Sequence, residues 1–224
     1  AIPGHAEPFA YRLIVADAEG NEYELEDPFR FRDWLLTDFD IYLHGEGNFF
    51  DSYTKFGAQM RTVDGVHGVN FAVWAPNAQR VSVVGNFNAW DGRVHPMRAR
   101  GGSGVWELFL PDLGPGEFYK FELRDQHGNI HVKIDPYATA FQTRPETACI
   151  TQADIDFNWD DAAWLEARAR TDWSHQPLSV YEVHLGSWQR SADGNYLGYR
   201  ELAERLADYV KEAGFTHIEL LPIT

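Results

Sequence analysis

Four titratable side chains near the C-terminal end of the chain have the spacing of neighbours on one strand face. Glu182 and His184 are two residues apart, and so are His217 and Glu219. On two adjacent strands each pair would point to one side of a sheet, because side chains alternate with a period of two. Carboxylates and imidazoles bind zinc, yet this spacing matches no standard zinc motif. We therefore predict a supporting role for these four residues and no metal site.

A tryptophan and a lysine are the other candidates for a functional site. Trp90 follows the turn NFN at residues 86–88, where a large exposed indole is costly unless it contacts a partner. That partner would be either a ligand or a neighbouring domain. In the run 118–124, Tyr119 and Phe121 share one strand face and Lys120 takes the other. Lys120 is therefore expected to point away from the core, either as a ligand contact or as a solvated strand residue.

A β-sandwich over residues 63–142 would position Trp90 and Lys120. Short β-prone runs recur there with Gly, Pro and Asn between them, which is typical of an antiparallel sandwich of the immunoglobulin-like kind. Trp74, Trp106 and Phe87 are expected to fill its core. The predicted strands are residues 69–74, 80–85, 105–110 and 118–124.

The residues upstream of this sandwich predict two further segments. Runs at 11–15 and 21–25 flank the turn DAEG, which indicates a β-hairpin. A hairpin alone is marginal, so residues 1–30 are interpreted as the tail end of an extra N-terminal β domain. Residues 31–62 are interpreted as a connecting segment with a short helix at 33–39. The segment is expected to lie over a domain surface, because its aromatic residues need burial.

The residues downstream predict a change to parallel structure. A linker at 143–177 contains a short helix at 160–170, and residues 178–185 and 215–221 are expected to be strands buried on both faces. Between them an apolar stripe predicts a helix that ends at Gly214. A strand, helix and strand in this order form a right-handed βαβ unit. The stripe consists of Leu202, Leu206, Tyr209, Val210 and Ala213.

Composition limits the partners and the compartment. The formal net charge of −15 and the isoelectric point near 4.9 disfavour nucleic acid and membrane surfaces. A neutral polysaccharide meets no such repulsion, and 8 Trp, 10 Tyr and 15 Phe could supply ring faces for it. Cys149 is the single cysteine, expected as a small packed side chain, and no stretch of the sequence has the basic start and apolar middle expected of a signal peptide. A cytoplasmic protein is therefore expected.

The order of motifs resembles that of bacterial glycogen branching enzymes of the α-amylase superfamily. YEVHLGSW at 181–188 and the following YRELAERLADYVKEAGFTHIELLPIT are similar to the first strand, helix and second strand of their catalytic TIM (β/α)8 barrel. Residues 69–92 and 116–138 resemble the carbohydrate-binding module before that barrel, and residues 137–150 resemble the join. On this resemblance residues 178–224 are expected to begin a truncated barrel. Since the chain starts at Ala1 and stops at Thr224, we expect it to be a piece of a longer protein.

The resemblance implies an activity and a role for several residues. The family cleaves an α-1,4-glucan through a covalent intermediate and transfers the segment to a 6-hydroxyl, with an Asp, a Glu and an Asp after barrel strands four, five and seven. No residue here matches those positions, so none is assigned as catalytic. The resemblance implies no cofactor. Its implied partners are α-glucans such as glycogen and amylose, and the rest of the barrel.

Within the module, the matching tryptophan, Trp90, would stack on glucose with Lys120 beside it. Related modules have a second binding tryptophan shortly after the lysine, where this chain has QHGN at 126–129. Weak binding by the isolated module is therefore expected. The four residues Glu182, His184, His217 and Glu219 would support the interior wall of the barrel.

Two alternatives remain at this point. One is a stand-alone glycan-binding or scaffolding protein with the βαβ tail as an appendage. The other is the front of a hydrolase of the isoamylase or trehalohydrolase type. Retardation in glycogen gels and product analysis after incubation with amylose would separate these alternatives from a branching enzyme.

Overall fold

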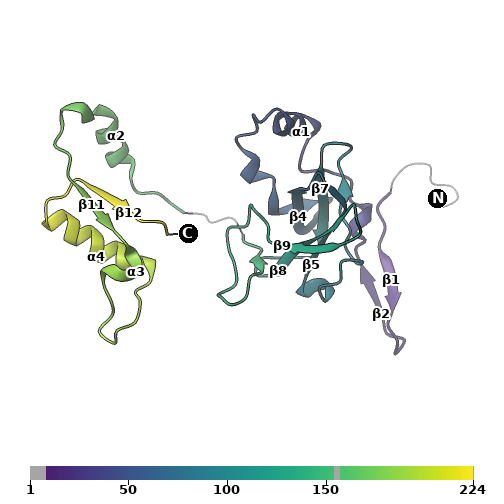
Figure 1. Ribbon diagram of the computed structural model, residues 1–224. Coiled ribbons are helices and arrows are strands. Elements are labelled where there is room, and N and C mark those ends of the chain that lie inside the picture. The colour runs from purple at the N-terminus through teal and green to yellow at the C-terminus, as the bar shows by residue number, and fades with distance from the viewer. Residues whose placement is uncertain (1–8, 154–156, 224) are drawn as a thin grey trace. The chain divides into compact units, whose positions relative to one another are not determined.

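The computed structural model describes residues 9–153 and 157–223 of the chain. The chain forms two compact units, residues 1–156 and 157–224, and each is described by itself. The first contains antiparallel sheets with their connecting segments, and the second contains a parallel strand pair with its helices (Figure 1).

The predicted hairpin is confirmed near the start of the first unit. Strands β1 (Leu13–Ala16) and β2 (Glu22–Leu25) pair antiparallel. The carboxylate of Asp17 closes the turn by accepting from the backbone N–H groups of Glu19 and Asn21, both at 2.9 Å. Such an Asx turn is the reason that a short acidic segment reverses the chain here. An extra β domain that contains the hairpin stays a prediction, and residues 1–8 lie outside the described residues.

The predicted sandwich is confirmed, with more strands than the sequence indicated. One sheet has the order β3-β4-β7-β6, and in the other β8 lies between β5 on one edge and β9 and β10 on the opposite edge. The first sheet begins at Gly57 rather than Val63, because residues 57–63 pair along β4. The strands are β3 (Gly57–Val63), β4 (Val66–Trp74), β5 (Ala78–Gly85), β6 (Arg98–Ala99), β7 (Val105–Pro111), β8 (Phe118–Asp125), β9 (Ile130–Lys133) and β10 (Cys149–Ile150).

Strand alternation fills the core between the two sheets. Leu108 and Leu110 on β7 and Tyr119 and Phe121 on β8 are all buried in one cluster. Trp106 and Phe87 pack against this cluster, as expected. Cys149 is fully buried there, which confirms its prediction as a packed side chain.

The expectation for Trp74 is wrong. Its side chain is 54% exposed, although it ends the core strand β4. Core side chains of β4 point inward at Val69, Phe71 and Val73, so alternation turns Trp74 to the outer face of the sheet. The residue type alone suggested burial, whereas the strand period decides the face that the side chain takes.

The connecting segment contains a helix later than predicted. The helix α1 (Asp38–Gly45) starts at Asp38 and not at Asp33, because Thr37 caps it. The Thr37 hydroxyl accepts from the Asp40 N–H at 3.2 Å, and the Asp40 carboxylate accepts from the Thr37 N–H at 2.8 Å. This capping box fixes the helix start. Short 3-10 turns lie on either side at Pro28–Arg30 and Ser52–Thr54.

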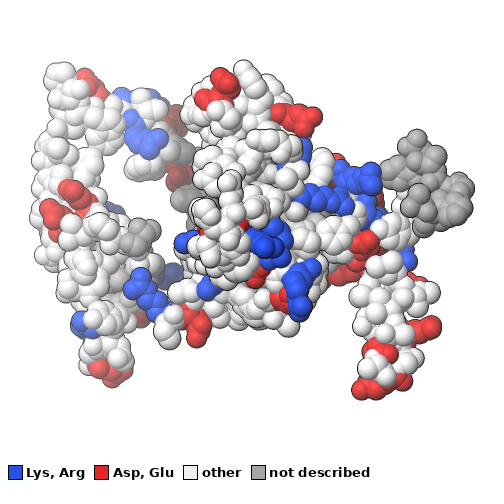
Figure 2. All heavy atoms as spheres, turned by 45° about the vertical axis from the view of Figure 1, so that its right-hand side comes forward, with Lys and Arg blue, Asp and Glu red and all other residues white. Residues whose placement is uncertain are grey.

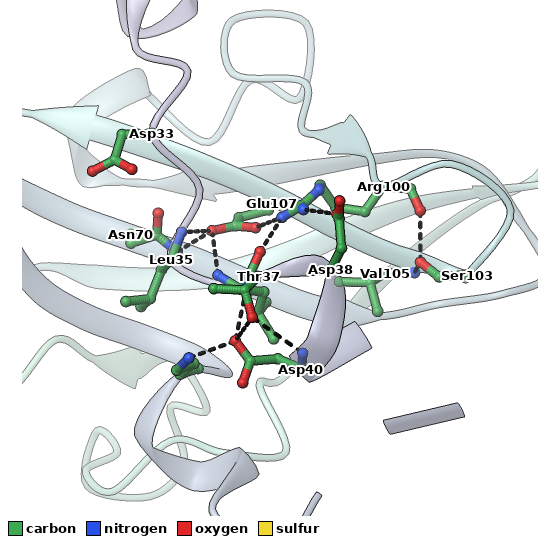
Figure 3. A network of polar contacts seen from close by, with 12 residues as sticks. Asp33, Leu35, Thr37, Asp38, Asp40, Asn70, Arg100, Ser103, Val105 and Glu107 are labelled. Atoms are coloured by element: carbon green, nitrogen blue, oxygen red, sulfur yellow. Dashed lines mark hydrogen bonds and ion pairs between the residues drawn. The ribbon is translucent and has the colours of Figure 1, made fainter. Parts of the chain in front are cut away.

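A buried carboxylate anchors this segment to the first sheet (Figure 3). Glu107 on β7 is fully buried and accepts from the backbone N–H of Leu35 at 2.7 Å and from the Asn70 amide at 3.1 Å. Its other oxygen accepts from the Arg100 guanidinium at 2.6 Å. Leu36 beside it packs against Phe56 in a second buried cluster. The segment therefore covers the outer face of the first sheet.

The second unit holds one parallel β-α-β arrangement. Strands β11 (Val180–Val183) and β12 (His217–Leu220) pair parallel, and α4 (Tyr199–Glu212) lies between them in sequence. The apolar stripe of α4 buries Leu206 and Val210 against Val183, as its periodicity predicts. The other helices are α2 (Ala162–Arg170), the 3-10 turn Trp173–His175 and α3 (Leu185–Trp188).

Burial on both faces of these strands was predicted and is not found. Two of four residues in β11 and all four in β12 are exposed, and both strands are shorter than expected. One helix can cover one face of a strand pair, so the described residues of this unit supply no cover for the other face.

Of the helices in the described part of the chain, none has the length and apolarity that a membrane crossing requires.

Candidate functional site

The turn after β5 is held in an unusual backbone conformation. A 3-10 turn (Asn86–Asn88) is followed by Ala89 and Trp90, with φ values of 52° and 61°. Positive φ is uncommon outside glycine and costs free energy, so it persists where surrounding bonds enforce it. The N–H of Trp90 donates to the carbonyl of Gly85 at 2.9 Å and closes the turn.

Asn88 is the polar centre of this turn. Its amide oxygen accepts from the Gly85 N–H at 2.9 Å, and its amide nitrogen donates to the Val83 carbonyl at 2.9 Å. The same nitrogen lies 2.9 Å from Nδ1 of His95, which must accept because an amide nitrogen only donates. Burial lowers the pKa of His95, which suits this neutral acceptor role. A buried asparagine and a neutral histidine therefore hold the turn.

These bonds present the indole of Trp90 at the surface. The side chain is 40% exposed, and its Nε1–H donates to Oδ1 of Asn86 at 3.1 Å. The hydrogen bond fixes the ring plane while part of the ring meets solvent. Next to it, a hydrogen bond from the Arg93 guanidinium lowers the pKa of Asp91 to about 2. The turn therefore combines a fixed aromatic ring with polar neighbours.

Lys120 lies on the outer face of the same sheet. Its register partner on β5 is Val84, one residue before the Gly85 carbonyl that binds the Trp90 backbone. The half-buried Lys120 donates from Nζ to the Thr147 hydroxyl at 2.7 Å. An ammonium carries three N–H donors, so this bond leaves capacity for a ligand. The two residues predicted from sequence thus both lie near the end of β5.

An ion pair occupies the outer face next to Lys120. The Arg80 guanidinium donates to the Glu122 carboxylate, and Glu122 is the register partner of Ser82. A side chain added at Gly92 would overlap that carboxylate, so the loop after Trp90 lies directly on it. On the face shown in Figure 2, Lys and Arg side chains are interspersed with acidic and uncharged ones. Such a mixed surface suits a neutral ligand better than a highly charged one.

The four candidate residues of the second unit are brought together only in part. Glu182 and Glu219 are direct register partners, whereas His217 pairs with Val180. His184 lies past the end of β11, at the start of α3, where its Nδ1 is 2.8 Å from the Ser187 hydroxyl. All four side chains are exposed. Among residues 9–153 and 157–223, no group of three or more His, Cys, Asp or Glu is placed to hold a metal ion.

The chain is similar to a carbohydrate-binding module and to part of longer enzymes. The family model of carbohydrate-binding module 48, the isoamylase N-terminal domain, matches residues 55–138. Over 215 residues, 96% of the chain, the sequence is 55% identical to the 1,4-alpha-glucan branching enzyme GlgB of Methylococcus capsulatus. Over 218 residues, 97% of the chain, it is 52% identical to GlgB of Nitrosococcus oceani. The chain is therefore similar to part of the 1,4-alpha-glucan branching enzymes over nearly its whole length.

The chain is much shorter than these branching enzymes. It covers 29% of the Methylococcus and of the Nitrosococcus protein. Among solved structures, a Salmonella typhimurium protein described as a candidate alpha amylase matches 76% of this chain and 25% of its own, with 24% identity and a TM-score of 0.53. Klebsiella pneumoniae PulA matches 75% of this chain and 17% of its own, with 23% identity and a TM-score of 0.51. At these identities the likeness concerns the fold alone.

The module match includes both sandwich residues that the resemblance to branching enzymes singled out, Trp90 and Lys120. Sequence reasoning missed the residues that hold them, namely Asn88, His95 and Thr147. The motif NFN carried a signal for Asn88, because asparagine favours tight turns. No sequence signal connected Lys120 to Thr147, since they are 27 positions apart and meet only through the pairing of β8 with β10.

Proposed function

We propose that this chain is the α-glucan-binding part, and the first part of the catalytic barrel, of a glycogen branching enzyme. The whole protein would cleave α-1,4-glucan chains and transfer the segment to a 6-hydroxyl, which makes α-1,6 branches. The observation that carries this proposal is the 55% identity to a branching enzyme over 96% of the chain. No residue of this chain is assigned a catalytic role, so the chain by itself is expected to be inactive.

Within the sandwich we propose that Trp90 stacks on a glucose ring and that Lys120 donates to its hydroxyls. The 40% exposed indole held by Asn86 and the strained turn support this role. A sugar ring has an apolar face and polar edges, and a fixed indole and an ammonium near the same end of β5 would complement these two features.

For the second unit we propose that β11, α4 and β12 begin a (β/α)8 barrel. The parallel pairing of β11 and β12 supports further strands beside them. Their exposed faces support further cover, because parallel sheets are normally covered on both faces. In that arrangement Glu182, His184, His217 and Glu219 would line the interior and support the active-site wall.

We also expect a cytoplasmic protein, on the basis of its single cysteine.

Affinity electrophoresis in gels that contain glycogen tests the binding proposal. The 224-residue chain should be retarded, and Trp90→Ala should weaken retention at least about fivefold, as loss of a central aromatic contact does. Trp164→Ala is a matched control, because Trp164 is exposed on α2 in the second unit. Equal retention of wild type and Trp90→Ala would contradict the assignment of Trp90.

The activity of the whole protein needs its own test. The tested protein is a branching-enzyme relative in which this chain replaces the matching segment. Its incubation with amylose should lower iodine staining and create α-1,6 linkages without releasing short oligosaccharides. A hydrolase would release reducing ends, and a stand-alone binder would leave amylose intact.

A further inference from the structure

We propose that Trp74 forms a second α-glucan contact, at the opposite end of β5 from Trp90. This inference rests on the proposed function in its choice of ligand class. Its structural basis is independent of Trp90, because it comes from the surface around the end of β4.

The indole of Trp74 is exposed and yet held in place. It is 54% exposed, and its Nε1–H donates to the carbonyl of Ser103 at 3.2 Å. The ring of His44 contacts it edge-on, with centroids 5.8 Å apart and an interplanar angle of 72°. Gly104, with φ of 78°, lets the neighbouring turn approach, since a Cβ there would lie 3.1 Å from the indole nitrogen. A ring fixed in this way needs little ordering when a ligand binds.

Two hollows share Trp74 as a wall. One, of about 610 Å³, lies towards α1 and is lined also by Tyr42, His44 and Glu46. The other, of about 420 Å³, lies towards the β4–β5 turn and is lined also by Asn77 and Asp125. Both are open to solvent and large enough for a sugar unit or a short oligosaccharide. Trp74 therefore lies between two hollows and lines both of them.

The lining of these hollows fits a neutral, hydroxyl-rich ligand. Tyr42 is 59% exposed, so the larger hollow has an aromatic residue on two walls. Its polar groups are an imidazole, two hydroxyls and a single carboxylate, and the smaller hollow combines Arg124, Lys133 and His131 with Asp125. Neither hollow presents one dominant charge for an ionic ligand. Aromatic faces with mixed donors and acceptors suit glucose rings, and the family of the chain points to α-glucan.

The distance between the two tryptophans matters for the ligand size. Trp74 lies just before β5 and Trp90 just after it, and this strand has eight residues. At about 3.3 Å per residue the two ends are roughly 25 Å apart. A short maltooligosaccharide would occupy one contact at a time, whereas a glycogen chain could reach both. Simultaneous contacts raise apparent affinity through a high effective concentration.

The test compares Trp74→Ala, Trp90→Ala, the double variant and the control Trp164→Ala in the 224-residue chain. In glycogen gels each single variant should bind about fivefold less tightly, and the double variant about 25-fold less tightly, because distant contacts act independently. Maltotriose binding should fall only about twofold in each single variant. Trp164→Ala should match wild type. Full glycogen binding by Trp74→Ala would overturn the proposal.

A second measurement follows binding in the wild-type chain and uses a conservative variant only to assign a resonance. In the wild-type chain labelled with 15N, maltoheptaose should shift the indole N–H resonance of Trp74, assigned by its loss in Trp74→Phe. A shift of Trp90 alone overturns this inference and leaves the proposed function standing. A shift of Trp74 alone overturns the role of Trp90 and supports the second contact. If neither indole resonance shifts, the second contact at Trp74 and the role of Trp90 are both overturned. This outcome includes the case in which another part of the protein covers Trp74.

Discussion

The Glu107 carboxylate and the Arg100 guanidinium form an ion pair of 2.6 Å in which the side chains are 0% and 7% exposed. The two residues come from β7 and from the segment just before it, and together they bind the backbone of residues 35 and 36 (Figure 3). This pair connects the sandwich to a segment some 70 positions earlier in the sequence. Its loss should therefore affect the whole first unit.

Glu107→Gln is expected to lower the free energy of unfolding of the first unit by about 3 kcal/mol. The change leaves the buried guanidinium of Arg100 with only the fully exposed carboxylate of Asp38 as counter-charge, which is costly in a poorly solvated site. Urea denaturation at neutral pH measures the difference. Asp33→Asn is the control, because Asp33 pairs with Arg61 but is 67% exposed, so its loss should change stability by less than about 1 kcal/mol. Similar effects for both variants would refute the anchoring role of Glu107.

Gly85→Ala should weaken both stability and glycogen retention. A Cβ at this position would overlap the carbonyl of Phe118 and the ring of Phe87, both adjacent to the Trp90 turn. Overpacking of this kind costs about 1–3 kcal/mol. Thermal unfolding and affinity electrophoresis measure the two effects. Gly102→Ala is the matched control, since nothing lies within 4 Å of its added methyl group, and it should behave as wild type.

Stability should fall as the pH drops below about 6.5, in part through His95. Burial holds the pKa of His95 below its ordinary value, so the unfolded chain takes up a proton that the folded chain resists. The folded state thus gains stability from His95 above pH 6.5 and loses it as the pH falls towards the folded pKa. His95→Gln keeps an acceptor for Asn88 without a titration. In urea denaturation between pH 5 and 7.5 this variant should show a shallower pH dependence, and an unchanged slope would be evidence against a role for His95.

Cys149 should be inert to thiol reagents in the folded protein. It is fully buried in the sandwich core, and burial raises the pKa of its thiol. The reaction with an aromatic disulfide reagent should follow the fraction of unfolded protein across a urea titration. Prompt modification in native buffer would show that β10 opens readily.

Local patterns in the sequence determined much of this fold. Period-two alternation placed Tyr119 and Phe121 in the core and Lys120 on the outer face, and the stripe of α4 placed Leu206 and Val210 against the strands. These predictions succeed because each depends on neighbours along one strand or one helix. The resemblance to branching enzymes, which rested on ordered motifs, is confirmed by the identity of the relatives.

Only the tertiary structure decided the features that depend on distant residues. The start of α1 depends on Thr37 and Asp40, but its position on the sheet depends on Glu107, and the orientation of the Trp74 indole depends on its hydrogen bond to Ser103. A sequence pattern states which face a side chain takes within its own element. Whether that face meets core, solvent or a distant polar group depends on how the elements pack, and the linear order of residues does not encode that contact directly.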